Sequence, residues 1–250
     1  MTTNMKLLIE TLKEMKKEYE KAIRNRTYTK LIRSRKLIEI LHQYAKKELE
    51  ERFPSSWISM DKRVYGYPKI KTQDILIQPL QDDKKSVSTG PIVSVNIRSQ
   101  LSSIEKNYDT LFERLFAEAL NLHNRFPYLV LGYLYLLPKI GYDDKAAKNG
   151  KVRFGERYNM EKYILSFLSI NGRRDPSDVP WKYERVALLI VDFEKDPPQV
   201  IDDVKTLASQ GLISEDFANL FSFKPISIRG FFDEIKKTAV ERYYLLLRSR

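Results

Sequence analysis

Three side chains on two short segments have the types and spacing to hold a divalent metal beside a fixed positive charge. Asp74 is the only acid in the strand-like run 74–78, and Asn96 and Arg98 stand two residues apart in a second such run. Residues two apart on a strand point to the same face, so Asn96 and Arg98 are expected to lie together. Carboxylate and amide oxygens suit Mg²⁺ or Mn²⁺, while arginine is a cation that cannot act as a base. Asp74 and Asn96 thus offer oxygen atoms that a divalent ion can use, and Arg98 offers a fixed positive charge.

The elements that must position these residues follow from hydrophobic periodicity. Alternation with period two predicts a strand at 91–98, and apolar steps of three and four residues predict a helix after it. A nearly continuous apolar run at 128–137 is typical of a strand covered on both faces. The expected helices are 5–24, 29–52, 103–125, 157–170, 199–210, 214–221 and 230–247, and the expected strands are pieces of 57–67, then 74–78, 91–98, 128–137 and 185–193.

The order from residue 29 to 137 is helix, strand, strand, strand, helix and strand, which predicts an α/β fold with a mixed central sheet flanked by helices. We expect a basic helical arm at 1–28 and an α/β domain at 29–250 that ends in helices. This order resembles the core of the PD-(D/E)XK nucleases, which include many type II restriction endonucleases. The resemblance covers about 29–137, with the strand at 185–193 as an added member of the sheet.

In that family the second strand supplies an aspartate, and the third supplies an acid and a lysine two residues apart. Asp74 matches the aspartate, while Asn96 and Arg98 stand in the places of the acid and the lysine. Both depart from the pattern, because asparagine brings no charge and arginine cannot lose its proton. The resemblance thus implies a restriction endonuclease-like core with an altered metal site, in which Asp74 and Asn96 are ligands and Arg98 stabilises developing negative charge. It also implies Mg²⁺ (or Mn²⁺) as the cofactor.

Three explanations of the missing acid stay open. The acid has moved to the following helix, as in some restriction enzymes of this class, and Glu113 is then the first choice as ligand. Alternatively the metal site is weakened or lost, or Asn96 is an engineered replacement of an acid. The other acids of the following helix are Glu105, Asp109 and Glu118.

Two further residues could join the site. In this class an acid often comes from the helix before the sheet, where Glu39 lies beside apolar positions; a solvated position is the alternative. Gln100 could reach a phosphate or a metal-bound water, or it could simply start the next helix. For Asp74 the structural alternative is an ion pair with Lys71 or Arg98.

The charge of the chain points to a polyanionic partner. The net charge is +11 with a pI near 9.5, and residues 1–52 hold 14 Lys and Arg against eight Asp and Glu. We expect this surplus to bind double-stranded DNA, although general solubility would also explain it. The candidate DNA contacts are Arg24, Arg26, Arg33, Arg35, Lys36, Lys71, Lys148, Lys151, Arg153, Arg173 and Arg174.

Several classes of protein are excluded. The chain has no Cys, which removes disulfide scaffolds, cysteine zinc sites and cysteine nucleophiles and suits a reducing cytoplasm. It has no Gly-rich phosphate loop, no G-x-S-x-G elbow and no H-E-x-x-H motif. No run of about 18 apolar residues predicts a membrane span. The two histidines, His42 and His123, are expected to be surface or packing residues of helices.

The expected function is a metal-dependent DNA endonuclease of restriction type that acts as a homodimer, because cutting both strands of a palindrome requires two sites related by a two-fold axis. A catalytically inactive nucleic-acid-binding protein on the same fold is one alternative. A basic scaffold or assembly protein is another.

Overall fold

The computed structural model describes residues 3–79 and 90–247. Within them a six-stranded mixed sheet has the order β1-β2-β3-β4-β7-β8. The first three strands form an antiparallel meander, β3, β4 and β7 run parallel, and β8 is antiparallel at the edge. This architecture confirms the expected α/β class and adds the strand near 185–193 to the sheet. The strands are β1 (Ile58–Tyr65), β2 (Ile70–Ile77), β3 (Val93–Ser99), β4 (Val130–Pro138), β7 (Arg185–Asp192) and β8 (Gln199–Ile201), with a separate pair β5 (Gly141–Tyr142) and β6 (Phe154–Glu156).

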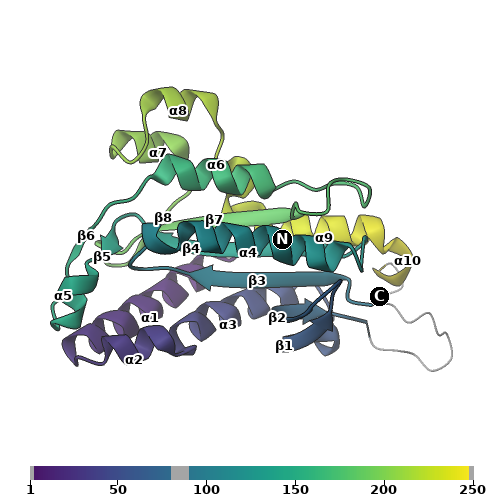
Figure 1. Cartoon of the computed structure of the whole chain (residues 1–250), viewed down its shortest axis with the longest axis horizontal. Coiled ribbons are helices and arrows are strands. Elements are labelled where there is room, and N and C mark those ends of the chain that lie inside the picture. Colours follow the sequence, from purple (N-terminus) through teal and green to yellow (C-terminus); the bar gives the residue numbers. More distant parts are fainter. Residues whose placement is uncertain (1–2, 80–89, 248–250) are drawn as a thin grey trace.

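Helices cover both faces of the sheet (Figure 1). One face packs against α1, α3 and α9, and the other packs against α4 and α6, with α7 and α8 beyond α6. The helices are α1 (Met5–Arg24), α2 (Tyr28–Arg33), α3 (Lys36–Glu50), α4 (Tyr108–His123), α5 (Asp144–Lys148), α6 (Met160–Ile170), α7 (Val204–Ser209), α8 (Glu215–Leu220), α9 (Phe231–Arg242) and α10 (Tyr244–Leu247), with 3-10 turns at Ser55–Trp57, Glu105–Asn107, Lys224–Ile226 and Ile228–Gly230.

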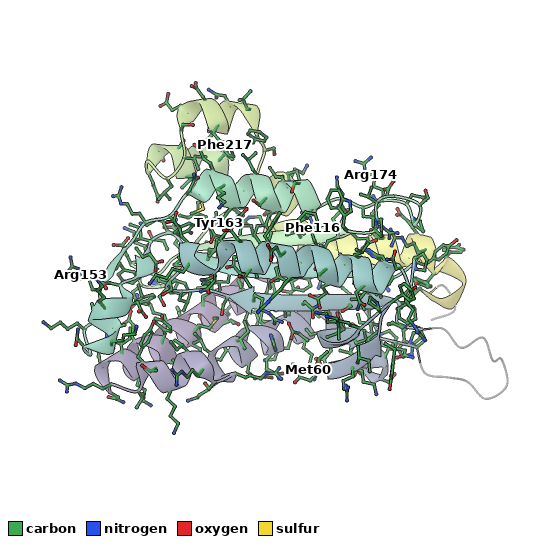
Figure 2. The ribbon with its side chains drawn as sticks, in the orientation of Figure 1. Met60, Phe116, Arg153, Tyr163, Arg174 and Phe217 are labelled. Atoms are coloured by element: carbon green, nitrogen blue, oxygen red, sulfur yellow. The ribbon has the colours of Figure 1, made fainter. Side chains whose placement is uncertain are left out.

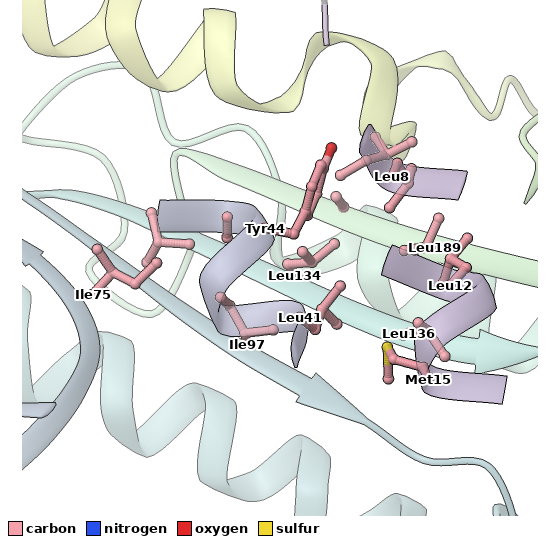
Figure 3. Packing of buried hydrophobic residues seen from close by; sticks show 14 of the residues in the cluster. Leu8, Leu12, Met15, Leu41, Tyr44, Ile75, Ile97, Leu134, Leu136 and Leu189 are labelled. Carbon is pink, nitrogen blue, oxygen red and sulfur yellow. The ribbon is translucent and has the colours of Figure 1, made fainter. Parts of the chain in front are cut away.

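Strand alternation explains the two cores. On β4, Leu134 and Leu136 face α1 and α3, while Tyr133 and Tyr135 face α4 and α6. Because both faces of β4 are covered, every residue of this strand is buried, as its continuous apolar run predicts. Figure 3 shows Leu41 of α3 over Leu134 and Leu136.

The N-terminal helix belongs to this core. Leu8, Leu12 and Met15 of α1 are fully buried in the same cluster as Leu41 and Leu49 of α3. Residues 1–28 were expected to form an arm, and α1 within that range is packed against α3.

Two of the differences from the expected elements have a clear physical reason. The helix expected at 29–52 is divided into α2 and α3, because Ser34 adopts an extended conformation and its hydroxyl donates to the Leu31 carbonyl. The segment expected as a helix at 199–210 begins as β8, since pairing with β7 satisfies its backbone at the sheet edge and buries Ile201. None of the described helices combines the length and the apolar character needed to cross a bilayer.

Candidate functional site

Side chains take the place of backbone groups in the hydrogen bonding between β2 and β3 at the point where these strands separate. The ladder between these strands ends at the pair of Ile75 and Val95. Beyond it, the Asp74 amide donates to Asn96 Oδ1 over 2.9 Å, and the Ile97 amide donates to Asp74 Oδ2 over 2.8 Å. The strands can therefore diverge here without leaving these amides unpaired, and a buried carboxylate is fixed in the gap.

The amide of Asn96 also reaches a carboxylate on α4. Asn96 Nδ2 donates to Glu118 Oε1 over 3.0 Å and to Gln73 Oε1 over 2.9 Å. Gln73 Nε2 donates to the same Glu118 oxygen over 3.3 Å, and the Ser94 hydroxyl donates to Gln73 Oε1 over 2.6 Å. Asn96 thus connects the backbone of Asp74 to the side chain of Glu118.

Arg98 places a positive charge against Asp74 and interacts with Glu118 over a longer distance. Its Nη1 donates to Asp74 Oδ2 over 2.8 Å, while about half of the side chain, 49%, stays exposed. Burial acts against the charged guanidinium, but attraction to Asp74, Tyr133 and Glu118 outweighs it and raises the pKa of Arg98. Burial raises the pKa of Glu118, although Gln73 and Arg98 oppose this shift.

Arg98 and Glu118 line a polar cleft. The cleft has a volume of about 490 Å³ and lies between the end of β3 and α4. A second hollow of about 590 Å³ shares Arg98, Ser99, Gln100 and Asn107 with it and extends toward α2 and α3. The charged residues lining the first cleft are Lys71, Arg98, Arg114 and Glu118.

A buried histidine lies on the other side of Asp74. His42 of α3 is 1% exposed, and its Nε2 lies 3.7 Å from Asp74 Oδ2 while its Nδ1 lies 3.8 Å from Glu39 Oε2. Among the described residues, neither ring nitrogen has a hydrogen-bond partner. Burial lowers the pKa of His42 in spite of the two acids, which favours the neutral ring at neutral pH.

The other expected site residues take different positions. Glu39 is partly exposed beside His42 and accepts a hydrogen bond from Gln43. Glu113 is exposed on α4, so Glu118 is the α4 acid that contacts Asn96. Gln100 donates to the carbonyls of Ser103 and Ile104 and accepts from Tyr135, which makes it an anchor of the loop after β3.

No known protein family, curated protein or solved structure matches the chain. Function has to be inferred from the contacts of the site itself.

The donor set suits one mode of magnesium binding. Across residues 3–79 and 90–247, no three His, Asp or Glu side chains converge so that they could hold an ion by themselves. Mg²⁺, however, is usually bound by one or two carboxylates and keeps water or phosphate oxygens as its other ligands. Asn96 contacts Asp74 through the backbone amide of Asp74 and contacts Glu118 through its carboxylate, so the candidate carboxylates for this mode are those of Asp74 and Glu118.

Basic residues near the N-terminus meet the loop around Gly150. Arg26 lies against Gly150, where an added Cβ would be 3.4 Å from Arg26 Cγ. The Tyr28 hydroxyl donates to Asp144 over 3.0 Å. Two groups that are separate in the sequence therefore form one surface, which also exposes Lys151 and Arg153.

Many of the expected DNA contacts already have acidic partners. Arg24 pairs with Glu20, Arg35 with Asp61, Lys36 with Glu18, and Lys148 with Asp144. The described cations of the expected set that form no ion pair are Arg26, Arg33, Lys71, Lys151, Arg153 and Arg174.

The expected DNA contact by Arg173 requires correction. This residue is 3% exposed, and its guanidinium donates to Glu184 and to the carbonyls of Pro127 and Pro176. Its neighbour Arg174 is exposed, and in Figure 2 it lies toward the opposite end of the molecule from Arg153.

Sequence reasoning missed Gln73 and underestimated His42. Gln73 directly precedes Asp74 on β2. Its side chain points to the α4 face of the sheet, whereas that of Ile75, two residues later, packs on the α3 face. Regular alternation would put both on one face, so no sequence signal identifies Gln73. His42 follows Leu41 on the buried side of α3. Its position in the helix pattern can predict burial but not its proximity to Asp74.

Proposed function

We propose that this protein is a metal-dependent DNA endonuclease of restriction type, built on a PD-(D/E)XK-like core. The observation that carries the proposal is the bridge made by Asn96 between the backbone of Asp74 and the carboxylate of Glu118. Arg98 contacts Asp74 and lines one cleft together with Glu118. Two carboxylates and a fixed cation are the groups that phosphodiester hydrolysis needs.

Each residue has a separate task. Asp74 and Glu118 would hold Mg²⁺ or Mn²⁺, which supplies charge stabilisation and an acidified water when bound. Arg98 donates to a non-bridging phosphate oxygen and cannot take a proton from water. Asn96 contributes no charge, and instead orients Glu118 and fixes the backbone at Asp74.

The raised pKa of Glu118 agrees with a site that is completed by a cation. A carboxylate that burial disfavours in its ionised form gains more from a divalent ion than an exposed carboxylate does. The ion pair of Arg98 with Asp74 has to rearrange as the metal and the phosphate enter, and the half-exposed Arg98 side chain leaves room for this.

Cleavage of supercoiled plasmid with Mg²⁺ or Mn²⁺ tests the proposal. The wild-type protein should give discrete bands, and Asp74→Asn should remove at least 99% of the rate while keeping DNA binding. Glu118→Gln should have the same effect, whereas Glu113→Gln, an exposed position on the same helix, should cut at the wild-type rate. A Glu118→Gln variant that cuts normally would refute the assignment of this carboxylate.

The same experiment separates the alternatives. The second candidate is an inactive nucleic-acid-binding protein. The observation that favours it is the salt bridge between Arg98 and Asp74, because Arg98 already balances the negative charge that would bind a metal. Salt-dependent DNA binding without cutting in either metal would support this candidate. Absence of any DNA affinity would leave a basic scaffold protein. A restriction-type dimer also predicts twice the chain mass of 29.5 kDa in sedimentation equilibrium.

A further inference from the structure

The β1–β2 hairpin carries an unpaired positive charge together with exposed aromatic rings. Residues 62–73 contain four Lys and Arg and no acid. None of these cations, Lys62, Arg63, Lys69 and Lys71, forms an ion pair with any described residue, unlike several cations elsewhere on the surface. At the tip, Tyr65 is 63% exposed and Tyr67 is 67% exposed, far more than a tyrosine that serves packing.

The tip is held in a fixed position on α4. Asn121 accepts from the Lys69 amide over 2.8 Å and donates to the Lys69 carbonyl over 2.9 Å. The Tyr67 amide donates to the Asn121 carbonyl over 2.8 Å. Gly66 packs so closely that an added Cβ would lie 2.1 Å from Asn121 Nδ2. The two tyrosines are thus presented by a backbone that is already ordered, which lowers the entropic cost of binding through them.

The hairpin leads directly into the candidate site. Tyr65 pairs with Ile70 at the start of β2, and Asp74 follows four residues later on the same strand. Four strand residues span about 13 Å, close to the width of about 12 Å of the major groove of DNA. Asn121, which holds the tip, lies about one turn beyond Glu118 on α4.

From this arrangement we propose that the β1–β2 hairpin is a contact element for double-stranded DNA. Tyr65 and Tyr67 enter the groove next to the phosphodiester held at Asp74, and Lys62, Arg63 and Lys69 bind the flanking phosphates. Tyrosine suits this role because its hydroxyl can donate to phosphate or sugar oxygens while its ring covers apolar sugar and base surface. The proposal rests on the proposed function for the placement of DNA, and it names which part of the chain reads the groove.

Fluorescence anisotropy with a labelled duplex, without Mg²⁺, tests this element. The double variant Y65A/Y67A should raise the Kd about tenfold or more, with an unchanged salt slope because no charge is lost. K62A/R63A/K69A should reduce the slope of log K against log salt by roughly 2 to 3. Tyr128→Ala is the matched control, since Tyr128 is 58% exposed at the start of the chain segment leading into β4 and should bind like the wild type.

The outcomes distinguish the hairpin from the nuclease proposal. If the wild type cuts DNA and Y65A/Y67A binds with unchanged Kd, the hairpin proposal is refuted and the nuclease proposal stands. If the wild type binds without cutting and Y65A/Y67A binds tenfold more weakly, the hairpin proposal stands and the nuclease proposal fails. If Y65A/Y67A keeps the wild-type Kd for DNA but has a different oligomeric mass, the tyrosines form a protein interface instead. If Y65A/Y67A loses more affinity for single-stranded than for duplex DNA, the proposal is also overturned.

Discussion

At the residue scale, two polar side chains do work that backbone groups do elsewhere in a sheet. Asp74 and Asn96 each complete a hydrogen bond across the gap between β2 and β3. This explains how an aspartate can be buried next to Ile75 and Ile97 without a large penalty, because the carboxylate accepts an amide proton and an arginine proton. The carboxylate that we propose as a metal ligand therefore also has a structural role between the two strands.

Glu118→Gln is expected to stabilise the protein at neutral pH. Burial raises the pKa of Glu118. Ionised Glu118 therefore lowers the free energy of unfolding at high pH, and this cost disappears at a pH where Glu118 is protonated in both the folded and the unfolded chain. Chemical denaturation should show Glu118→Gln to be more stable than the wild type at pH 7.5, with the difference vanishing as the pH falls to about 4. A variant that is less stable at pH 7.5 would contradict this expectation.

Arg173→Ala is expected to destabilise the protein strongly. Glu184 is buried with Arg173, Arg242 and His123, and removing one guanidinium leaves part of its charge unpaired. Loss of a partner from a buried ion pair costs about 3 kcal/mol in the free energy of unfolding. Arg174→Ala, next in the chain but exposed, should change it by less than about 0.5 kcal/mol.

The loss in Arg173→Ala should depend on pH. Burial opposes ionisation of Glu184, but His123, Arg242 and the Leu131 amide outweigh it and lower the pKa of this carboxyl. Arg173 pairs with the same carboxylate over 2.8 Å, and this pair requires the ionised form of Glu184. Stability from the pair is therefore present above the ordinary glutamate pKa and is lost as the pH falls through the lowered value. The difference between wild type and Arg173→Ala should therefore shrink in acid, and a difference that grows below pH 4 would refute this account.

At the element scale, the hairpin and α4 act as one unit. β2 carries Asp74, α4 carries Glu118, and Asn121 ties the hairpin tip to the last turns of α4. A change at the tip can therefore alter both the proposed DNA contact and the position of a site carboxylate.

Gly66→Ala tests this coupling. Its Cβ would meet Asn121 Nδ2 at 2.1 Å and the Asn121 carbonyl at 2.9 Å, so the tip has to move away from α4. The expected loss is about 1 to 3 kcal/mol in the free energy of unfolding, measured by urea denaturation. Gly155→Ala, where an added Cβ has no neighbour within 4 Å, is the control, and equal losses for both variants would argue against a specific contact at Gly66.

At the scale of the whole molecule, the basic surface is assembled from distant parts of the chain. Arg26 at the end of α1 lies against Gly150 beside Lys151 and Arg153, close to the end of β3 where the cleft opens. Arg174 lies toward the other end of the molecule from Arg153, so these two basic residues do not belong to one patch (Figure 2).

The double variant K151A/R153A should weaken DNA binding for all sequences alike. Removing two phosphate contacts should reduce the slope of log K against log salt by roughly 2. Lys205→Ala combined with Lys237→Ala removes two exposed charges on α7 and α9 and should leave the slope unchanged. Equal effects of the two double variants would indicate binding by net charge alone.

The sequence by itself determined the order of the elements between 29 and 137 and the class of the sheet. Alternation at 91–98, the continuous apolar run at 128–137 and the amphipathic helix between them depend on local periodicity, which burial on one or both faces imposes directly. The same local signals were insufficient at 199–210, where pairing with β7 decided the conformation of β8.

Only the tertiary structure decided which side chains meet. Glu113 and Glu118 are five residues apart and point about 140° apart on a helix, so the packing of α4 on the sheet selects which one contacts Asn96. The approach of His42 to Asp74 and of Arg26 to Gly150 also depends on how helices dock. Such contacts join residues far apart in sequence, and local periodicity carries no information about their docking.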